Sequence, residues 1–292
     1  MKKILAVINF WPSAEKVLRK ARAVASAIHA EIHVYCPVSS EIEEMNRYVG
    51  FDNFDDVKAE LLALSEARLE QLPGIDQLES QVEWQTRPYQ GVASKAEELS
   101  AELVVTSLSA HSVLGDFLHK PDDWHLLRDA KCPVLIVNDE DKPYHAVVAA
   151  IDALGGADEH NALTARILDE AAMMSEMLRL PLKVVSVVPE PSYIYSDLVV
   201  IDSIAIAKFR ADAEVIAAQY QAQILARAGV KVHSAQVVVG RVETELQKIL
   251  AESGLLVVGT IANKGIKGVF IGNTCERLLR HLARGESARA HG

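Results

Sequence analysis

The sequence is poor in cysteine and aromatic residues and contains no long hydrophobic run. Aromatic residues make up 5% of the 292 residues, and the three cysteines, Cys36, Cys132 and Cys275, show no CxxC or other metal-ligand spacing. No apolar stretch approaches the ~18–20 residues of a membrane span. The N-terminal apolar run is also shorter than the ~7–15 residues of a secretory signal. We therefore expect a soluble cytoplasmic protein with reduced thiols.

Positively charged residues are fewer than negatively charged ones. Lys and Arg together number 30 against 40 Asp and Glu, which gives a formal net charge of −10. Proteins that bind nucleic acid or anionic membranes usually present a basic surface. We therefore expect neither nucleic acid nor a membrane as a partner. Hydrophobic residues make up 50% of the chain, and a length near twice the ~150 residues of a typical domain predicts two domains, each with its own core.

The first half of the chain alternates short apolar runs with segments of helical periodicity. We predict strands at Lys3–Phe10, Glu31–Val38, Ser80–Gln85, Leu103–Thr106 and Pro133–Val137, and helices at Ser13–Ala30, Asp56–Leu72, Val92–Ala101 and Asp123–Ala130. Nearly continuous apolar strands indicate a parallel sheet that is covered on both faces. The segment between Val38 and Asp56 is polar and is expected to be a loop.

The second half repeats this series. We predict strands at His145–Ile151, Leu182–Val188, Lys231–Val239 and Leu255–Gly259, and helices at Glu159–Leu180, Asp202–Ala228, Val242–Glu252 and Thr274–Ala283. ILAVIN (Ile4–Asn9) matches VVAAID (Val147–Asp152) at an offset of 143 positions. ELSAELVVTS matches ILAESGLLVVGT, whose VVGT lies 153 positions after VVTS. Such a repeat indicates duplicated domains.

The repeat and a polar linker, NDEDKPY, set the predicted domain boundaries. The first domain spans residues 1–139, the second spans 145–283, and residues 284–292 form a tail. The first half closes with the apolar run CPVLIV (Cys132–Val137), but the second half ends in HLARGESARAHG. The second domain is therefore expected to lack a fifth strand of its own.

Two features of the second half fall at predicted strand ends. Asp152 directly follows the first strand of that half, and the segment GTIANKGIKG (residues 259–268) follows the fourth. The chain then reaches Gly272-Asn273-Thr274, which opens the last predicted helix. In an open parallel sheet, ligands bind beyond the carboxyl ends of the strands, where the strand order reverses. Both features are therefore candidates for a ligand site.

The residue types in these segments suit an anion. Glycines let backbone N–H groups approach a phosphate, and a helix N-terminus supplies further donors and partial positive charge. Lys264 and Lys267 add charge, Thr274 adds a hydroxyl, and the Asp152 carboxylate can accept hydrogen bonds from ribose hydroxyls. The pattern is neither GxxxxGK[ST] nor GxGxxG. From the residues alone, two interpretations stay open: a phosphate or nucleotide site, or a capped helix with tight turns.

The repeat, the segment PDDWHLLRDAKCPVLIV (Pro121–Val137) and the segment GTIANKGIKGVFIGNTCERLLRHL (Gly259–Leu282) resemble the universal stress proteins of the tandem two-domain bacterial type. The resemblance covers nearly the whole chain. It implies two doubly wound α/β domains with parallel sheets in the strand order 3-2-1-4-5. ATP-binding members carry G-x2-G-x9-G-[ST] and an acid after the first strand.

That motif maps onto the second domain with two departures. Gly259 and Gly272 stand at the first and last glycines and Asp152 at the acid, whereas Ala262 replaces the second glycine and Asn273 stands where Ser or Thr is expected. The candidate cofactor-binding residues are Asp152, Gly259, Thr260, Ala262, Lys264, Gly265, Gly272, Asn273 and Thr274. No catalytic or metal-ligating residue is predicted.

The first domain departs further from the motif. Asn9 replaces the acid, the loop after Thr106 carries a single glycine up to Gly115, and Asp122 and Asp123 would repel a triphosphate. We therefore predict that this domain does not bind ATP. His111, His119 and His125 are weak candidates for a metal site with Asp122 or Asp123, and surface or capping roles are favoured instead.

The resemblance implies a stress-response or signalling module that binds ATP with Mg²⁺ and takes part in resistance to stress, including DNA-damaging agents. Any ATP hydrolysis would be slow, because no general base or acid pair is evident beyond Asp152. Two alternatives stay open. One is a protein-interaction module whose nucleotide sites have decayed, which Ala262 and Asn273 favour. The other is a binder of an apolar phosphorylated small molecule beside the apolar helix Ile201–Ala217.

Assembly is expected to follow from the sheet edges. The two domains would pack as an intrachain pseudo-dimer, and the missing fifth strand leaves an open edge that favours a homodimer.

Overall fold

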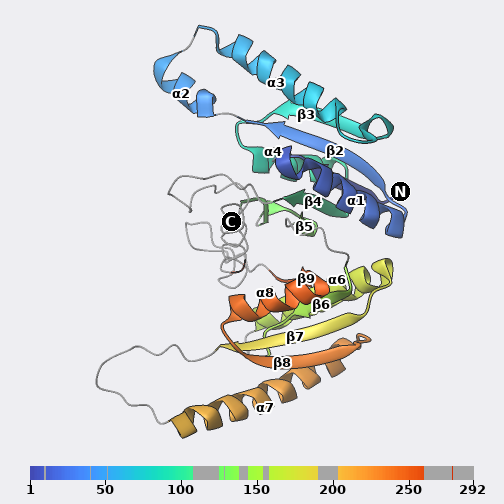
Figure 1. Cartoon of the computed structure of the whole chain (residues 1–292), viewed down its shortest axis with the longest axis vertical. Coiled ribbons are helices and arrows are strands. Elements are labelled where there is room, and N and C mark those ends of the chain that lie inside the picture. Colours follow the sequence, from blue (N-terminus) through green and yellow to red (C-terminus); the bar gives the residue numbers. More distant parts are fainter. Residues whose placement is uncertain are drawn as a thin grey trace. The chain divides into compact units, whose positions relative to one another are not determined.

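A computed structural model of the chain describes residues 1–9, 11–39, 41–50, 52–107, 125–127, 129–137, 144–153, 158–189, 203–259 and 278. The described residues up to Val137 form one compact unit, and those from Tyr144 onward form a second. Each unit is built around its own parallel sheet with helices packed against it (Figure 1).

The first unit contains a five-stranded sheet in the order β3-β2-β1-β4-β5, with every neighbouring pair parallel. Its strands are β1 (Lys3–Val7), β2 (Glu31–Val38), β3 (Glu79–Trp84), β4 (Leu103–Ser107) and β5 (Val134–Val137). Ile4 at the centre pairs with Ile32 on one side and with Leu103 on the other. This confirms the predicted strand order 3-2-1-4-5.

The helices of the first unit are α1 (Ala14–Ile28), α2 (Glu41–Val49), α3 (Phe54–Glu70) and α4 (Pro88–Glu98), with short 3-10 turns η1 (Trp11–Ser13) and η2 (Ile75–Gln77). The prediction of a loop between Val38 and Asp56 is wrong, because α2 occupies most of it. Between β4 and β5, residues 125–127 and 129 are helical, and they fall within the helix predicted at Asp123–Ala130.

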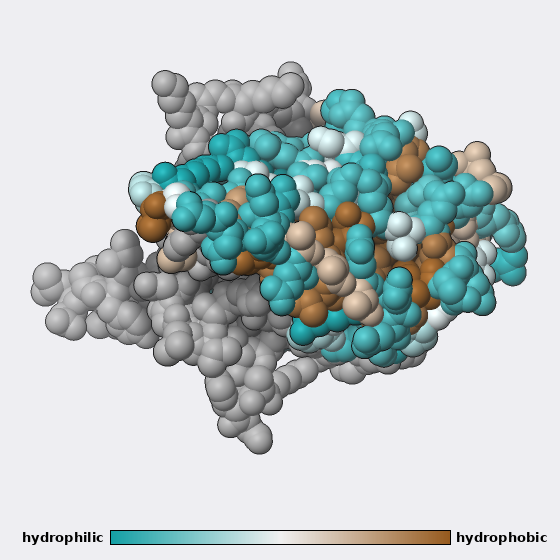
Figure 2. Space-filling view, turned by 90° about the horizontal axis from the view of Figure 1, so that it is seen from above, coloured by the Kyte–Doolittle hydropathy of each residue, from teal (hydrophilic) through white to brown (hydrophobic). Residues whose placement is uncertain are grey.

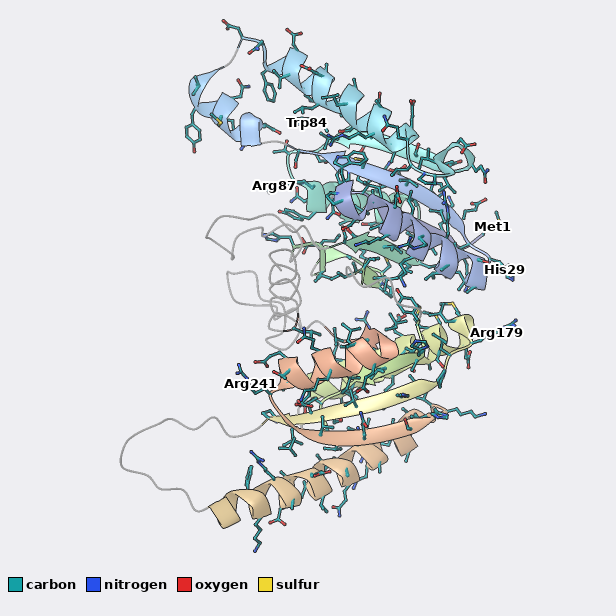
Figure 3. The ribbon with its side chains drawn as sticks, in the orientation of Figure 1. Met1, His29, Trp84, Arg87, Arg179 and Arg241 are labelled. Carbon is teal, nitrogen blue, oxygen red and sulfur yellow. The ribbon has the colours of Figure 1, made fainter. Side chains whose placement is uncertain are left out.

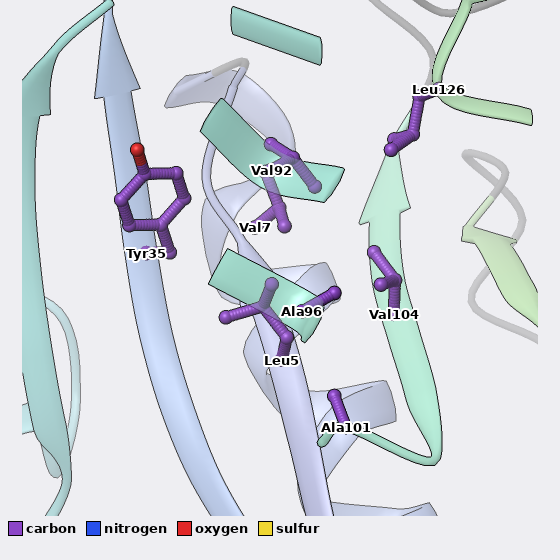
Figure 4. Close-up of a cluster of buried hydrophobic side chains, with 8 residues drawn as sticks. All are labelled: Leu5, Val7, Tyr35, Val92, Ala96, Ala101, Val104 and Leu126. Carbon is purple, nitrogen blue, oxygen red and sulfur yellow. The ribbon is translucent and has the colours of Figure 1, made fainter. Parts of the chain in front are cut away.

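One part of the core of the first unit lies between the sheet and α4, and the buried residues of α1 belong to another part. Leu5, Val7 and Val104 on the sheet contact Val92 and Ala96 of α4, together with Tyr35, Ala101 and Leu126 (Figure 4). All these side chains are buried, as expected when a helix covers one face of a parallel sheet.

The second unit contains a sheet of four described strands in the order β8-β7-β6-β9, again all parallel. The strands are β6 (Ala146–Ala150), β7 (Leu182–Pro189), β8 (Ser234–Gly240) and β9 (Gly254–Val257), and the helices are α6 (Asp158–Leu178), α7 (Ser203–Ala228) and α8 (Val242–Ser253). All five residues of β4 are buried, whereas Leu255 is the single buried residue of β9. Among the described residues, β9 has no neighbour that corresponds to β5.

The strand register corrects one detail of the repeat. Ile4 pairs with Leu103, and its counterpart Val147 pairs with Leu255, so the two fourth strands are related by 152 positions rather than by the predicted 153. Ser107 therefore corresponds to Gly259 and not to Thr260. The prediction followed the shared letters of VVTS and VVGT, whereas the hydrogen-bonded ladder decides which residues are equivalent.

The first helix of each unit ends at a non-glycine residue in the left-handed region. His29 has φ 53° and Arg179 has φ 54°, and both are labelled in Figure 3. Only glycine adopts this conformation without a steric cost from Cβ. Both units therefore carry the same small backbone strain after α1 and α6.

Replacing Arg179 with glycine is expected to raise the stability of the second unit by about 0.5–1 kcal/mol, because the strain disappears. The free energy of unfolding in urea, followed by circular dichroism, measures this gain. Arg166→Gly is the control: this exposed position inside α6 should lose about 1 kcal/mol. A loss of similar size for both variants would contradict the strain at Arg179.

Candidate functional site

The candidate site lies at the carboxyl ends of β6 and β9, where the strand order of the second sheet reverses. Ala149 pairs with Val257, so Asp152 and Gly259 both follow the ends of adjacent strands. The Ile151 amide still donates to the Val185 carbonyl at 2.9 Å. Ile151 and Ala153 are buried, whereas Asp152 between them is exposed. The structure therefore places an exposed carboxylate at the switch point of this sheet.

The other candidate residues fall outside the described part of the chain: Thr260, Ala262, Lys264, Gly265, Gly272, Asn273 and Thr274. Leu278, four positions after Thr274 in the sequence, is described. It is helical and buried against Val148, Val185 and Leu246. Leu126 has the corresponding place in the core of the first unit.

Gly259 has a packing role that the sequence did not reveal. A Cβ atom at this position would lie 2.8 Å from both the Ile167 Cδ1 and the Leu163 Cδ1 of α6. Real Cβ atoms essentially never approach other atoms this closely, so a side chain here would force the Leu163 and Ile167 side chains, or the end of β9, to move. The sequence pattern predicts close approach of a phosphate at this glycine, and the packing against α6 is a second reason for a residue without a side chain.

The corresponding edge of the first unit is tied together by side chains. Asn9 Nδ2 donates to the Ser107 carbonyl at 3.2 Å. The hydroxyls of Thr106 and Ser107 lie 3.2 and 3.4 Å from Asn9 Oδ1 and donate to it. Both ends of the Asn9 amide therefore bind β4. In the second unit Val258 and Gly259 stand at the positions of these two hydroxyl residues, so the two edges differ in chemistry.

A polar network on β2 and β3 was not singled out by the sequence. The Tyr35 hydroxyl donates to Glu83 Oε2 at 2.8 Å and accepts from Gln85 Nε2 at 2.9 Å. Burial, and then the hydrogen bond to Glu83, raise the pKa of Tyr35 well above its ordinary value. The three side chains supply one another's hydrogen-bond partners inside the unit, which indicates a structural role.

The thiols and histidines offer no metal centre within the described ranges, where no group of three or more His, Cys, Asp or Glu residues converges. Burial raises the pKa of Cys36 to about 12, whereas Cys132 is partly exposed. His125 stacks on Tyr89 with ring centroids 4.5 Å apart. The other candidate metal ligands, His111, His119, Asp122 and Asp123, and the third thiol, Cys275, lie outside the described residues.

Among the helices within the described residues, none is both long enough and apolar enough to cross a membrane.

Comparison with known proteins places these features in a family context. The model of the "Universal stress protein family" matches residues 1–138 and again 143–283. Universal stress protein E of Escherichia coli K12 is 24% identical and aligns with 96% of this chain and 90% of its own. A functionally unknown protein of Pseudomonas aeruginosa PAO1 has a similar fold, with a TM-score of 0.62, 20% identity and coverage of 99% of this chain and 98% of its own. A universal stress protein solved in complex with cAMP covers 48% of this chain and 98% of its own, with 16% identity and a TM-score of 0.32.

Proposed function

The chain belongs to the universal stress protein family, with two copies of the family's domain in tandem, and from this starting point we propose that its second domain binds one nucleotide, ATP with Mg²⁺. The exposed Asp152 carboxylate at the end of β6, beside the end of β9, carries the proposal. We propose that the protein acts as a nucleotide-gated stress or signalling module of the cytoplasm and takes part in resistance to stress, including DNA-damaging agents.

The chemistry of the edge supports a nucleotide. Ligands of open parallel sheets bind where the strand order reverses, and β6 lies at that point between β7 and β9. A carboxylate there can accept hydrogen bonds from both ribose hydroxyls, which are strong because the acceptor is charged. The family motif assigns the phosphates to the segment from Gly259 to Thr274, whose glycines and lysines suit an anion.

Mg²⁺ would reach the site with the nucleotide. This ion binds proteins through one or two carboxylates plus substrate phosphates, and Asp152 fits the role of such a carboxylate. When bound, the ion neutralises phosphate charge. This chain's own groups would bind and orient the nucleotide, and we expect at most slow hydrolysis because the candidate site includes no second acid that could activate water.

One nucleotide per chain is expected rather than two. In the first domain the Asn9 amide is already used by Thr106 and Ser107, and an amide cannot replace a carboxylate as a double acceptor for ribose. We therefore propose that the first domain, residues 1–139, is a partner without a nucleotide and that the second, residues 145–283, is the sensor.

Calorimetric titration with Mg-ATP tests the proposal. Nucleotide-free protein should bind one equivalent with micromolar affinity, and Asp152→Asn should weaken binding by about 10- to 100-fold because hydrogen bonds to a charged acceptor are lost. The matched control is Asn9→Asp, the reciprocal change in the first domain, which should leave affinity and stoichiometry unchanged.

Absence of binding to folded, nucleotide-free protein would contradict the proposal. The protein-interaction alternative would then be favoured, since packing against Leu163 and Ile167 explains Gly259 without any phosphate.

A further inference from the structure

The described side chains of helix α2 place a polar residue toward the domain and apolar residues toward solvent. Glu43, on the face toward the body of the first domain, binds residues at the end of β3. Met45, Tyr48 and Val49 occupy the opposite face at i, i+3 and i+4, with 53%, 82% and 65% of their surfaces exposed. A surface helix normally buries its apolar face. Among the described side chains of α2, hydrophobic burial therefore contributes little to its docking.

Among the described side chains of α2, Glu43 supplies two hydrogen bonds that dock the helix. Trp84 Nε1 donates to Glu43 Oε2 at 2.8 Å, and Thr86 Oγ1 donates to Glu43 Oε1 at 2.7 Å (Trp84 is labelled in Figure 3). Arg47 Nη2 lies 3.5 Å from Oε1, one turn along the same helix. Partial burial opposes ionisation of Glu43, but the two hydrogen bonds and the charges of Arg47 and Lys58 outweigh it and lower the pKa of this carboxyl.

The receiving side of this contact is fixed independently of α2. Phe54 of α3 meets the Trp84 ring edge-on at 6.1 Å between centroids, and the Lys58 ammonium lies 5.5 Å from the centre of the same ring. Trp84 itself ends β3, which pairs with β2. Glu43 thus joins a short helix to a site that α3 and the sheet already hold in place.

Gly50, the residue directly after α2, has free space beside its backbone. Gly50 follows α2 with φ +67°, and a Cβ atom built there would have no neighbour within 4 Å. Its amide closes the last turn of α2 by donating to the Asn46 carbonyl at 2.8 Å. Glycine has the greatest backbone freedom of any residue, and the space beside Gly50 leaves room for its own backbone to rotate.

The surroundings fit an element on the outside of the domain. Figure 2 looks onto the end of the first unit that carries α2 and α3, and hydrophobic residues interrupt the hydrophilic surface there. On the described parts of these two helices, the large hydrophobic residues that are exposed are Met45, Tyr48, Val49 and Leu64.

We propose that α2 is a hinged helix, latched to the first domain by the bridge from Glu43 to Trp84 and Thr86, and that it undocks as a unit about Gly50 while the sheet stays folded. Undocking exposes the Trp84 indole and the end of β3, and it leaves α2 with its apolar face available in a new orientation. The latch is a conformational device of the first domain and does not depend on nucleotide binding by the second.

Pulsed amide hydrogen exchange on the full-length protein tests the latch. Glu43→Ala should speed exchange of the amides of residues 41–49 by about 10-fold or more, since hydrogen bonds to a charged acceptor are lost, while amides of β1 and β4 keep their wild-type rates. Arg47→Ala is the matched control: it removes an exposed ion pair from the same face and should change exchange less than about 3-fold. Glu43→Gln, which keeps an acceptor oxygen, should lie between them.

Tryptophan fluorescence gives a second readout in a Trp11→Phe, Trp124→Phe background, where Trp84 is the remaining tryptophan. Glu43→Ala should shift its emission to longer wavelength. Unchanged exchange in residues 41–49 would overturn the proposal. Faster exchange throughout the sheet would overturn it as well, because Glu43 would then stabilise the whole domain rather than the position of α2.

Discussion

Replacing Gly259 with valine is expected to destabilise the second domain by about 3 kcal/mol or more, with alanine costing about 1–3 kcal/mol. The first added carbon would lie 2.8 Å from the Leu163 Cδ1 and the Ile167 Cδ1, and 2.9 Å from the Leu163 Cγ. Terminal methyl groups can move, but the branch point of Leu163 cannot do so without a new rotamer, and Ile167 is buried. The end of β9 must therefore separate from α6.

The first domain shows how the same junction accepts a side chain. Ser107 stands at the position of Gly259, and it is buried. If α1 and α6 are aligned on their left-handed ends, His29 and Arg179, the positions of Leu163 and Ile167 correspond to Ser13 and Val17. Ser13 ends η1 and Val17 lies in α1, and both are smaller than Leu163 and Ile167, so we expect more room for a Cβ at this junction.

The repeat supplies the test of this interpretation. Leu163→Ser and Ile167→Val, added to Gly259→Ser, rebuild the junction of the first domain and should recover most of the stability that Gly259→Ser loses. Urea unfolding followed by circular dichroism measures both domains, and tryptophan emission reports the first alone because all three tryptophans precede residue 125. Full stability of Gly259→Val, or no recovery in the triple variant, would contradict the packing argument.

The triple variant also distinguishes a packing role of Gly259 from a role in ligand binding. Gly259→Ser is expected to lose Mg-ATP affinity together with stability. If the triple variant regains stability but not affinity, the glycine itself is needed at the nucleotide. If it regains both, the requirement for glycine comes from Leu163 and Ile167.

The fold was largely predictable because buried parallel strands have a clear signature. Segments such as Glu31–Val38 are short apolar runs between polar ends, and that strand has the predicted bounds. The strand order followed from the family resemblance and is confirmed. Helix α2 was missed because the segment EIEEMNRYV is largely polar. Its docking contacts include the one from Glu43 to Trp84, which lies 41 positions away in the sequence.

The candidate site was predictable only in outline. The positions of Asp152 and Gly259 after adjacent strands follow from strand order, so the sequence could place both at one edge. It could not show why position 259 is glycine, because the reason lies in side chains of α6. Nor could it show that the Asn9 amide is held by Thr106 and Ser107, since that depends on the register of β1 against β4.

Alkaline pH should destabilise the first domain strongly. Tyr35 and Cys36 are neighbours on β2, with 1% and 3% of their surfaces exposed. Burial raises the pKa of both, that of Cys36 to about 12. For an acid whose pKa is raised by folding, the unfolded state loses its proton first. The contribution to stability is complete below the unfolded pKa and is lost as pH rises through the folded pKa.

The pKa values of the folded and unfolded states set the pH range in which stability is lost. Cys36 begins to destabilise the domain near its unfolded pKa of ~8.5, and each pH unit from there to about 12 costs about 1.4 kcal/mol. Tyr35 adds a similar loss of stability per pH unit above its unfolded pKa of ~10. A domain with a typical stability of about 5–15 kcal/mol would thus lose a large share of it by pH 11.

Urea midpoints from tryptophan emission between pH 7.5 and 10 isolate the thiol, because Tyr35 contributes little there. The wild type should lose stability steadily across this range, and Cys36→Ala should lose much less. Cys132→Ala is the matched control, since that thiol is partly exposed, and it should follow the wild type. Parallel pH dependence of the wild type and Cys36→Ala would show that Cys36 gains access to hydroxide or water in the folded domain, and that β2 opens far more readily than its burial indicates.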